Sequence, residues 1–296
     1  MLEGVFPPLP TPFTENGSLA LDRLRENVLG LTGTGLAGFL ALGSNGEAFH
    51  VSGEEAGQVF ATVRSAAPGK TVLAGIGQLS TAATLEMARR AGGAGCDAAL
   101  VLPPFYYKNS MTSEALRRHF EAVADGSPLP ILLYNVPANT GLAIPLDVVE
   151  ALSRHPNVLG IKDSSGEVAR LAEAIRLTRG GKPFSVFSGN YASTLPGLTF
   201  GIHGAILAVA NIAPRECVAL FRLFSEKRLE EAGALHLRLL PTAMAVTSKH
   251  GVPGLKAALD LLGLYGGAPR MPLLPVSPGV RDEIGRLLAE ADLLPR

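Results

Sequence analysis

The chain has 296 residues, 47% of them hydrophobic, and its 26 Lys and Arg are balanced by 26 Asp and Glu. A zero net charge without a basic run argues against nucleic-acid binding, which needs positive charge to neutralise phosphates. Two cysteines, Cys96 and Cys217, are too few for a disulfide framework. No apolar stretch is long enough to span a membrane. We therefore expect a cytoplasmic protein that binds neither nucleic acid nor membrane.

Short apolar segments recur along the first three quarters of the chain, separated by Gly, Pro or polar residues. Nearly every residue in them is apolar, which is typical of parallel strands that are covered on both faces. The expected strands span 4–6, 38–42, 72–74, 98–102, 131–134, 158–161, 185–187 and 205–207.

Amphipathic helical patterns lie between these strands. The first begins at Leu21, where apolar residues recur at spacings of three and four. Ser52 is a suitable N-cap for the second, because two glutamates follow it in the first turn, where the helix dipole favours acids. Other expected helix starts lie at Ser80, Thr112, Pro145 and Pro214.

The alternation of strand and helix repeats eight times and ends near Ser225. Eight such units close into a (β/α)8 barrel, or TIM barrel, whereas a doubly wound open sheet more often has five or six strands. Helical patterns over 226–249, 254–262 and 278–294 then follow without a strand. The sequence thus predicts an α/β fold, with a catalytic (β/α)8 barrel over 1–225 and a C-terminal helical domain over 226–296.

Catalytic groups of such barrels follow the carboxyl ends of the strands. Lys162 directly follows the apolar run 158–161 and precedes Asp163. A lysine buried at that point loses its charge more readily, and the neutral amine can attack a carbonyl. The alternative is an exposed loop lysine that pairs with Asp163.

Two further polar groups end apolar runs. Tyr134 closes the run 131–133 and could move protons, or it could be a core tyrosine with a satisfied hydroxyl. The turn 43–47 (GSNGE) follows the strand at 38–42. Its two glycines allow a tight turn whose N–H groups suit a carboxylate, with Ser44 and Asn45 as added donors. The alternative is an ordinary polar turn before the next helix.

Signatures of the common cofactors are missing from the sequence. The six histidines form no metal-binding pair, and neither a phosphate-binding loop nor a complete dinucleotide fingerprint is present. We therefore predict that the protein uses no metal, nucleotide or flavin.

Five motifs together identify a resemblance to a known family. They are GSNGE at 43–47, PFYY at 104–107, YNVP at 134–137, GIKDS at 160–164 and SG at 188–189. Over essentially its whole length the sequence resembles the dihydrodipicolinate synthase / N-acetylneuraminate lyase family. This family carries out pyruvate-forming Schiff-base chemistry on a barrel with a C-terminal helical domain.

The resemblance implies a role for each matching residue. Lys162 would form the imine, Tyr134 would shuttle protons, and Ser44 with Asn45 would hold the substrate carboxylate. Tyr106 would complete a hydroxyl relay from a neighbouring subunit, although Tyr107 is an alternative for that part. Gly189 and Ile206 would line the pocket. The family commonly forms homotetramers that are dimers of dimers, and we expect the same here.

Two departures bear on the choice of family member. Asn139 stands where the synthases usually carry an arginine for the carboxylate of their aldehyde, and Ser44-Asn45 stands where they usually have two threonines. These positions and the stretches 251–256 and 265–267 resemble 4-hydroxy-2-oxoglutarate aldolase. The resemblance thus favours a class I aldolase that cleaves 4-hydroxy-2-oxoglutarate to pyruvate and the aldehyde glyoxylate.

Other activities remain open at this point. The nearest are a dihydrodipicolinate synthase, which condenses pyruvate with aspartate semialdehyde, and a dehydratase or sugar-acid lyase that uses the same imine. A metal-assisted aldolase and a 2-oxo-acid sensor without turnover are further alternatives. A sensor needs neither Lys162 nor Tyr134, which argues against it.

Overall fold

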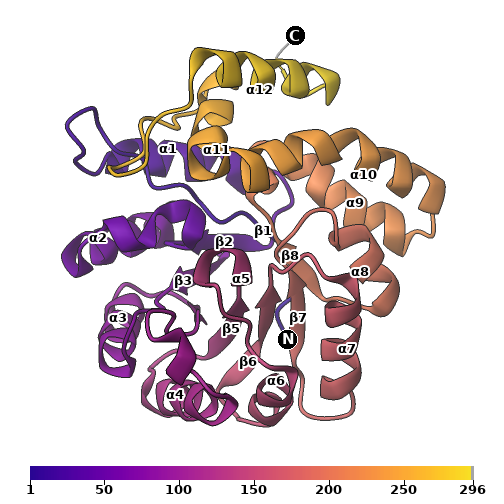
Figure 1. The fold of residues 1–296 in the computed structure, drawn as a ribbon. Helices are drawn as coiled ribbons and strands as arrows, with labels where there is room; N and C mark the ends of the chain where they lie inside the picture. The colour runs from indigo at the N-terminus through magenta and orange to yellow at the C-terminus, as the bar shows by residue number, and fades with distance from the viewer. Residues whose placement is uncertain (295–296) are drawn as a thin grey trace. The chain divides into compact units, whose positions relative to one another are not determined.

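The computed structural model describes residues 1–294, and it has the predicted (β/α)8-barrel fold with helices at the C-terminal end (Figure 1). Within these residues one sheet of eight strands has the order β1-β8-β7-β6-β5-β4-β3-β2. The strands are β1 (Gly4–Phe6), β2 (Gly38–Ala41), β3 (Thr71–Gly75), β4 (Ala98–Val101), β5 (Ile131–Asn135), β6 (Val158–Asp163), β7 (Ser185–Ser188) and β8 (Gly204–Ile206). Each expected strand is confirmed to within two residues at its ends.

The helices between the strands begin close to the predicted positions. Ser52 and Glu55 form a reciprocal capping box, and the side chains of Ser80 and Thr112 cap their helices. Pro145 is not in the first turn as expected but precedes the helix with an extended backbone. The helices are α1 (Leu21–Thr32), α2 (Gly53–Ala66), α3 (Thr81–Gly93), α4 (Ser113–Gly126), α5 (Pro137–Thr140), α6 (Leu146–Ser153), α7 (Val168–Thr178), α8 (Thr194–Phe200) and α9 (Pro214–Ser225).

The segment after residue 225 is helical, as predicted. It contains α10 (Leu229–Met244), the π-helical turn η5 (Ala245–Lys249), α11 (Gly251–Leu261) and α12 (Pro278–Glu290). These helices pack on one another, α12 against both α10 and α11. No helix within residues 1–294 combines the length and the apolar character needed to cross a bilayer.

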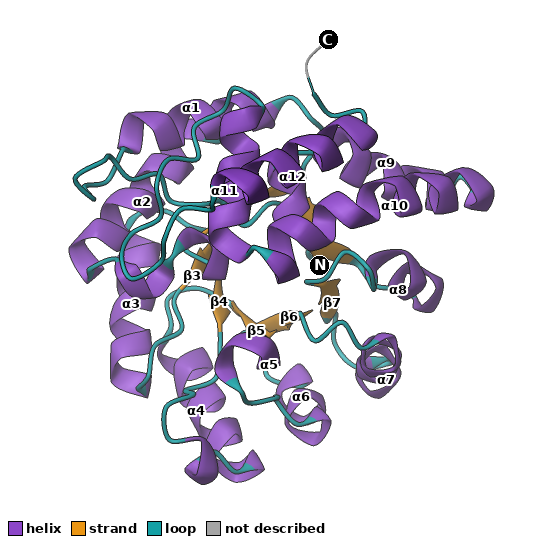
Figure 2. Ribbon diagram, turned by 45° about the horizontal axis from the view of Figure 1, so that its top comes forward, coloured by secondary structure: helices purple, strands orange, loops and turns teal. Residues whose placement is uncertain are grey.

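The chain divides into two compact units. The first comprises 1–4 and 73–206, and its helices α3, α4, α6, α7 and α8 lie outside strands β4 to β7 (Figure 2). Strands β5 and β7 are buried along their whole length, which explains their apolar composition. The second unit comprises 5–72 and the chain from 207 onward. The predicted domain boundary at residue 225 stays a prediction.

Candidate functional site

The structure brings together two residues that the sequence places at neighbouring strand ends. Tyr134 in β5 pairs in register with Lys162 in β6, so both side chains leave the sheet on the same face. Lys162 is 4% exposed and Tyr134 is 5% exposed. The Lys162 Nζ atom lies 4.3 Å from the centroid of the Tyr134 ring. An amine and a phenol are thus adjacent in a buried position.

Asp163, the residue after Lys162 in β6, forms an ion pair with Arg170 and not with the lysine. Asp163 is 2% exposed, and its Oδ2 atom accepts hydrogen bonds from Arg170 Nε at 2.6 Å and Asn135 Nδ2 at 2.8 Å. Its Oδ1 atom accepts from the Ser165 backbone N–H at 2.9 Å and hydroxyl at 2.5 Å. The alternative of an exposed lysine paired with Asp163 is therefore wrong, because both carboxylate oxygens are engaged elsewhere and Lys162 is buried.

The same cluster anchors the loop after β5. Asn135 Oδ1 accepts a hydrogen bond from the Ile144 backbone N–H at 2.9 Å, and Arg170 donates to the Ile144 carbonyl. The segment 136–143 is thereby held at both ends, next to Tyr134. Sequence reasoning missed Asn135 and Arg170 as anchors. A signal was available, since Asn135 and Asp163 directly follow the two predicted catalytic residues.

Gly189, a predicted pocket residue, lies against the lysine. A Cβ atom at this position would be 2.8 Å from Lys162 Cε and 1.9 Å from Ser164 Oγ. Only glycine leaves room for the lysine side chain here, because both distances are well below van der Waals contact. Ile206 ends β8 and is 1% exposed.

The predicted tyrosines Tyr106 and Tyr107, and Asn139, follow their strands and are exposed. Tyr106 and Tyr107 are 71% and 72% exposed, and their ring centroids are 5.0 Å apart in an edge-to-face arrangement. The role of either tyrosine in a relay across subunits stays a prediction. Asn139 lies in α5 with an exposed side chain, and its backbone N–H donates to the Val136 carbonyl at 3.0 Å. A role of Asn139 in binding a second substrate stays a prediction.

The turn at 43–47 belongs to the second unit and contains a short 3-10 helix, η1 (Ser44–Gly46). Sequence reasoning expected its two glycines to allow a tight turn. The left-handed residues are Leu42 and Glu47, each at φ 54°. The glycines serve close approach instead, since a Cβ on Gly43 would be 2.9 Å from Leu40 and one on Gly46 would be 3.0 Å from the Leu9 carbonyl.

Two left-handed non-glycine residues show that the turn is held by its surroundings, because each costs about 1 kcal/mol or more. Thr11 Oγ1 donates to the Gly46 carbonyl at 2.6 Å. Glu47 is buried and forms an ion pair with Lys256, which sequence reasoning missed. Ser44 and Asn45 are half-buried, and their binding to a substrate carboxylate stays a prediction.

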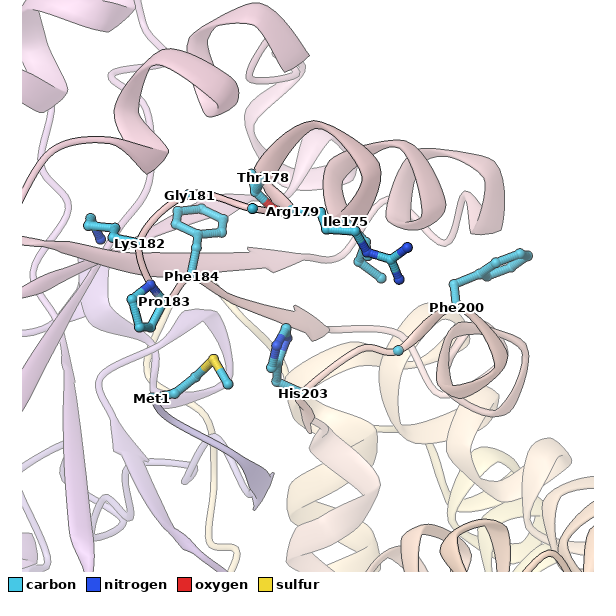
Figure 3. Close-up of a pocket in the computed structure, with 12 residues that line it drawn as sticks. Met1, Ile175, Thr178, Arg179, Gly181, Lys182, Pro183, Phe184, Phe200 and His203 are labelled. Carbon is cyan, nitrogen blue, oxygen red and sulfur yellow. The ribbon is translucent and has the colours of Figure 1, made fainter.

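A cavity of about 260 Å³ lies in the first unit among Met1, Lys182, Phe184 and His203 (Figure 3). Lys182 and Phe184 precede β7 and His203 precedes β8, so the cavity lies at the amino-terminal ends of these strands, whereas Lys162 lies near the carboxyl end of β6. Catalytic groups of (β/α)8 barrels gather at the carboxyl ends. The cavity is therefore separate from the candidate site.

Comparisons with known proteins identify the family of the chain. The model of the dihydrodipicolinate synthetase family matches residues 1–291. A 4-hydroxy-tetrahydrodipicolinate synthase from Methanothrix thermoacetophila is 39% identical over 277 residues, which cover 94% of this chain and 92% of that protein. A probable mitochondrial 4-hydroxy-2-oxoglutarate aldolase from Emericella nidulans is 37% identical over 283 residues, which cover 94% and 91%.

A solved structure extends the similarity to three dimensions. The chloride-inhibited dihydrodipicolinate synthase from Acinetobacter baumannii, complexed with pyruvate, matches with a TM-score of 0.94 and 29% identity, covering 99% of this chain and 100% of that one. The family match spans nearly the whole sequence, and the alignments include more than nine tenths of each of these relatives. The chain therefore belongs to the dihydrodipicolinate synthetase family, and it is a carbon–carbon lyase of the class I pyruvate aldolase type.

Proposed function

We propose that Lys162 is the Schiff-base lysine of this aldolase and that the protein cleaves 4-hydroxy-2-oxoglutarate to pyruvate and glyoxylate. The observation that carries the assignment of the lysine is its burial beside Tyr134, with the Nζ atom 4.3 Å from the ring centroid. The neighbouring carboxylate, Asp163, is engaged by Arg170. The amine is the nucleophile that imine formation requires.

The reaction begins when the Lys162 amine attacks the C2 ketone of the substrate. The carbinolamine loses water and becomes an iminium. Tyr134 then accepts the proton of the C4 hydroxyl while its own phenolic proton passes to water. The C3–C4 bond breaks, its electron pair forms the C2–C3 double bond of the enamine, and the C2–N π pair moves to the nitrogen. Glyoxylate leaves and an enamine remains, which takes up a proton at C3 and is hydrolysed to pyruvate and free Lys162. Each well-placed proton transfer of this kind contributes about 10²- to 10⁴-fold to the rate.

Asn139 supports the choice of 4-hydroxy-2-oxoglutarate over the synthase substrate. Its amide lacks the charged, bidentate donors with which an arginine binds a carboxylate. The second candidate is 4-hydroxy-tetrahydrodipicolinate synthase, which condenses pyruvate with aspartate semialdehyde. The names of several relatives favour it. A homotetramer, the contribution of Tyr106 from a neighbouring subunit, and a cytoplasmic location stay predictions.

Hydride reduction in the presence of pyruvate tests the proposal. We expect borohydride to fix pyruvate on the peptide that contains Lys162 and to leave a Lys162→Ala variant unlabelled. An unlabelled wild-type peptide would overturn the assignment. Tight pyruvate binding without turnover on any aldehyde would indicate a sensor, and loss of activity with a strong chelator would indicate a metal-assisted enzyme.

Turnover then distinguishes the two candidate substrates. We expect release of pyruvate from 4-hydroxy-2-oxoglutarate and little condensation of pyruvate with aspartate semialdehyde. Efficient condensation by the wild-type enzyme would show that the synthase is the correct family member.

A further inference from the structure

A buried ion pair joins the turn at 43–47 to the C-terminal helices. Glu47 Oε1 lies 2.7 Å from Lys256 Nζ, and each side chain is 1% exposed. Lys256 lies in α11, and its Nζ atom also donates to the Ala268 carbonyl at 3.0 Å and lies 4.6 Å from the centroid of the Phe13 ring. Charged groups remain in a protein interior only when they are paired in this way.

The second oxygen of the same carboxylate makes a separate connection. Glu47 Oε2 accepts a hydrogen bond from the Arg270 backbone N–H at 2.9 Å and lies 3.1 Å from His50 Nδ1. The Arg270 guanidinium donates to both oxygens of Glu55, at 2.7 and 2.9 Å, and lies 4.2 Å from the Phe13 ring centroid. Through one side chain the turn is therefore fixed to two segments of the C-terminal region.

The charge of Glu47 poses a problem for a turn that binds an anion. Glu47 is three positions from Ser44 and has a left-handed backbone, so its carboxylate belongs to the same turn as the predicted carboxylate donors. An unpaired negative charge there would repel a substrate carboxylate. Lys256 supplies the opposite charge. Burial lowers the pKa of Lys256, and the charge of Glu47 opposes this shift only in part.

We propose that Glu47 and Lys256 are positioning residues for the substrate carboxylate. The pair holds the backbone of the Ser44–Asn45 turn in place and cancels the charge of Glu47 beside it. The C-terminal helices then take part in recognising the 2-oxo acid without touching it. This inference rests on the proposed function, because it concerns the carboxylate of the ketone that Lys162 binds.

Two ketones of similar size separate carboxylate recognition from general damage. Pyruvate and hydroxyacetone share the ketone that forms the imine, but hydroxyacetone has a hydroxymethyl group in place of the carboxylate. Borohydride trapping on Lys162 is measured with each ketone over a range of concentrations. The ratio of the two trapping efficiencies reports carboxylate recognition, and a loss of folded protein leaves this ratio unchanged.

We expect Lys256→Met to raise the half-saturating pyruvate concentration by about tenfold or more, because it loosens the turn and also leaves the charge of Glu47 uncancelled. Glu47→Gln loosens the turn without leaving a negative charge, so it should raise this concentration by less. Trapping of hydroxyacetone should stay within about twofold of the wild type, since the lysine itself is untouched. The conservative Lys256→Arg variant should restore part of the pyruvate preference. Equal losses for the two ketones, or no loss for pyruvate, would overturn the inference.

Two further variants serve as controls. The double variant Glu47→Gln/Lys256→Met leaves no unpaired charge in the core, so it is expected to fold where a single variant does not. Its preference for pyruvate should remain low, and a return to the wild-type ratio would contradict a positioning role. Lys182→Met removes another partly buried lysine, which donates to the Val158 carbonyl near the opposite ends of the strands, and should leave the ratio unchanged.

The outcomes also separate this inference from the proposed function. If the wild type shows no imine at Lys162, the proposed function fails and the inference fails with it. If the wild type is trapped by pyruvate and the variants keep the wild-type ratio, the proposed function stands and the positioning role alone is wrong.

Discussion

Arg170 and Asp163 form an ion pair directly beside the residue that we propose as the Schiff-base lysine. The Arg170 Nε and Asp163 Oδ2 atoms are 2.6 Å apart, and the two side chains are 13% and 2% exposed. Asp163 follows Lys162 in β6, so the pair fixes the end of the strand from which the lysine projects. We test this pair and other side-chain contacts with four predictions. A fifth prediction concerns the exposed Asn139.

Loss of Arg170 should destabilise the whole fold. The Arg170→Met variant leaves Asp163 buried without its charged partner, which costs about 3–5 kcal/mol of the free energy of unfolding. Arg170→Lys keeps the charge but lacks the planar guanidinium that donates to both Asp163 and the Ile144 carbonyl. We therefore expect an intermediate loss of unfolding free energy. Denaturant unfolding at neutral pH measures both. A loss below about 1 kcal/mol for Arg170→Met would show that the pair does not anchor the strand end.

Tyr134→Phe tests the proton transfer. The variant keeps the ring that lies over Lys162 and removes only the hydroxyl, so we expect an unchanged fold and at least about a 10²-fold loss in kcat. Imine trapping with pyruvate should be affected less than cleavage, because breaking the C3–C4 bond requires the tyrosine. Steady-state kinetics and borohydride trapping are compared on the same preparation. Wild-type turnover in this variant would remove Tyr134 from the mechanism.

Gly189→Ala tests the close packing around the lysine. The new methyl group would meet Lys162 Cε at 2.8 Å and Ser164 Oγ at 1.9 Å, so the lysine must move. A displacement of about 1 Å at a reacting group can cost about 10²-fold in rate, and we expect a loss of this order in kcat/KM. Gly57→Ala is the matched control, because a Cβ there contacts nothing within 4 Å and alanine favours the helix. Activity of the control should equal that of the wild type, and a fully active Gly189→Ala enzyme would contradict the packing argument.

Glu55 and Arg270 give the fold a defined sensitivity to acid. The hydrogen bonds from Arg270 hold the pKa of Glu55 at about 2, compared with 4.5 for an unperturbed glutamate. A lowered pKa in the folded state stabilises the protein above pH 4.5, and this contribution is lost as the pH falls from there to about 2. Glu55→Gln should therefore be less stable than the wild type at pH 7, and the difference should shrink between pH 4.5 and 2. Unfolding curves over this range measure it, and a difference that does not change with pH would contradict the assignment.

Asn139→Arg tests the second substrate. An arginine adds a charged, bidentate donor in the exposed part of α5, and a hydrogen bond to a charged group is worth about 1.5–3 kcal/mol. We therefore expect at least about a tenfold gain in kcat/KM for condensation of pyruvate with aspartate semialdehyde. Asn139→Gln, which adds length without charge, should show no gain. Equal activity of the arginine variant and the wild type toward this aldehyde would show that residue 139 does not contact its carboxylate.

The sequence predicted most of the fold because local patterns specify it. The apolar runs at 131–134 and 158–161 became β5 and β6, since strands that are buried on both faces must be apolar throughout. Ser52, Ser80 and Thr112 cap helices where their side chains were expected to do so. Pro145 was placed wrongly by one position, because its ring suits the residue before a helix as well as the first turn.

Lys162 and Tyr134 could be identified from the sequence because a polar residue that ends an apolar run must lie at a strand end. The distance between the two side chains depends on the register of β5 against β6, and that register depends on the packing of the whole sheet. The partners of Asp163, the left-handed residues around the turn at 43–47 and the Glu47–Lys256 pair likewise became visible only in the tertiary structure. These contacts join residues that are far apart in the chain, such as Glu47 and Lys256. A local sequence pattern cannot predict which buried charged residues form such a pair.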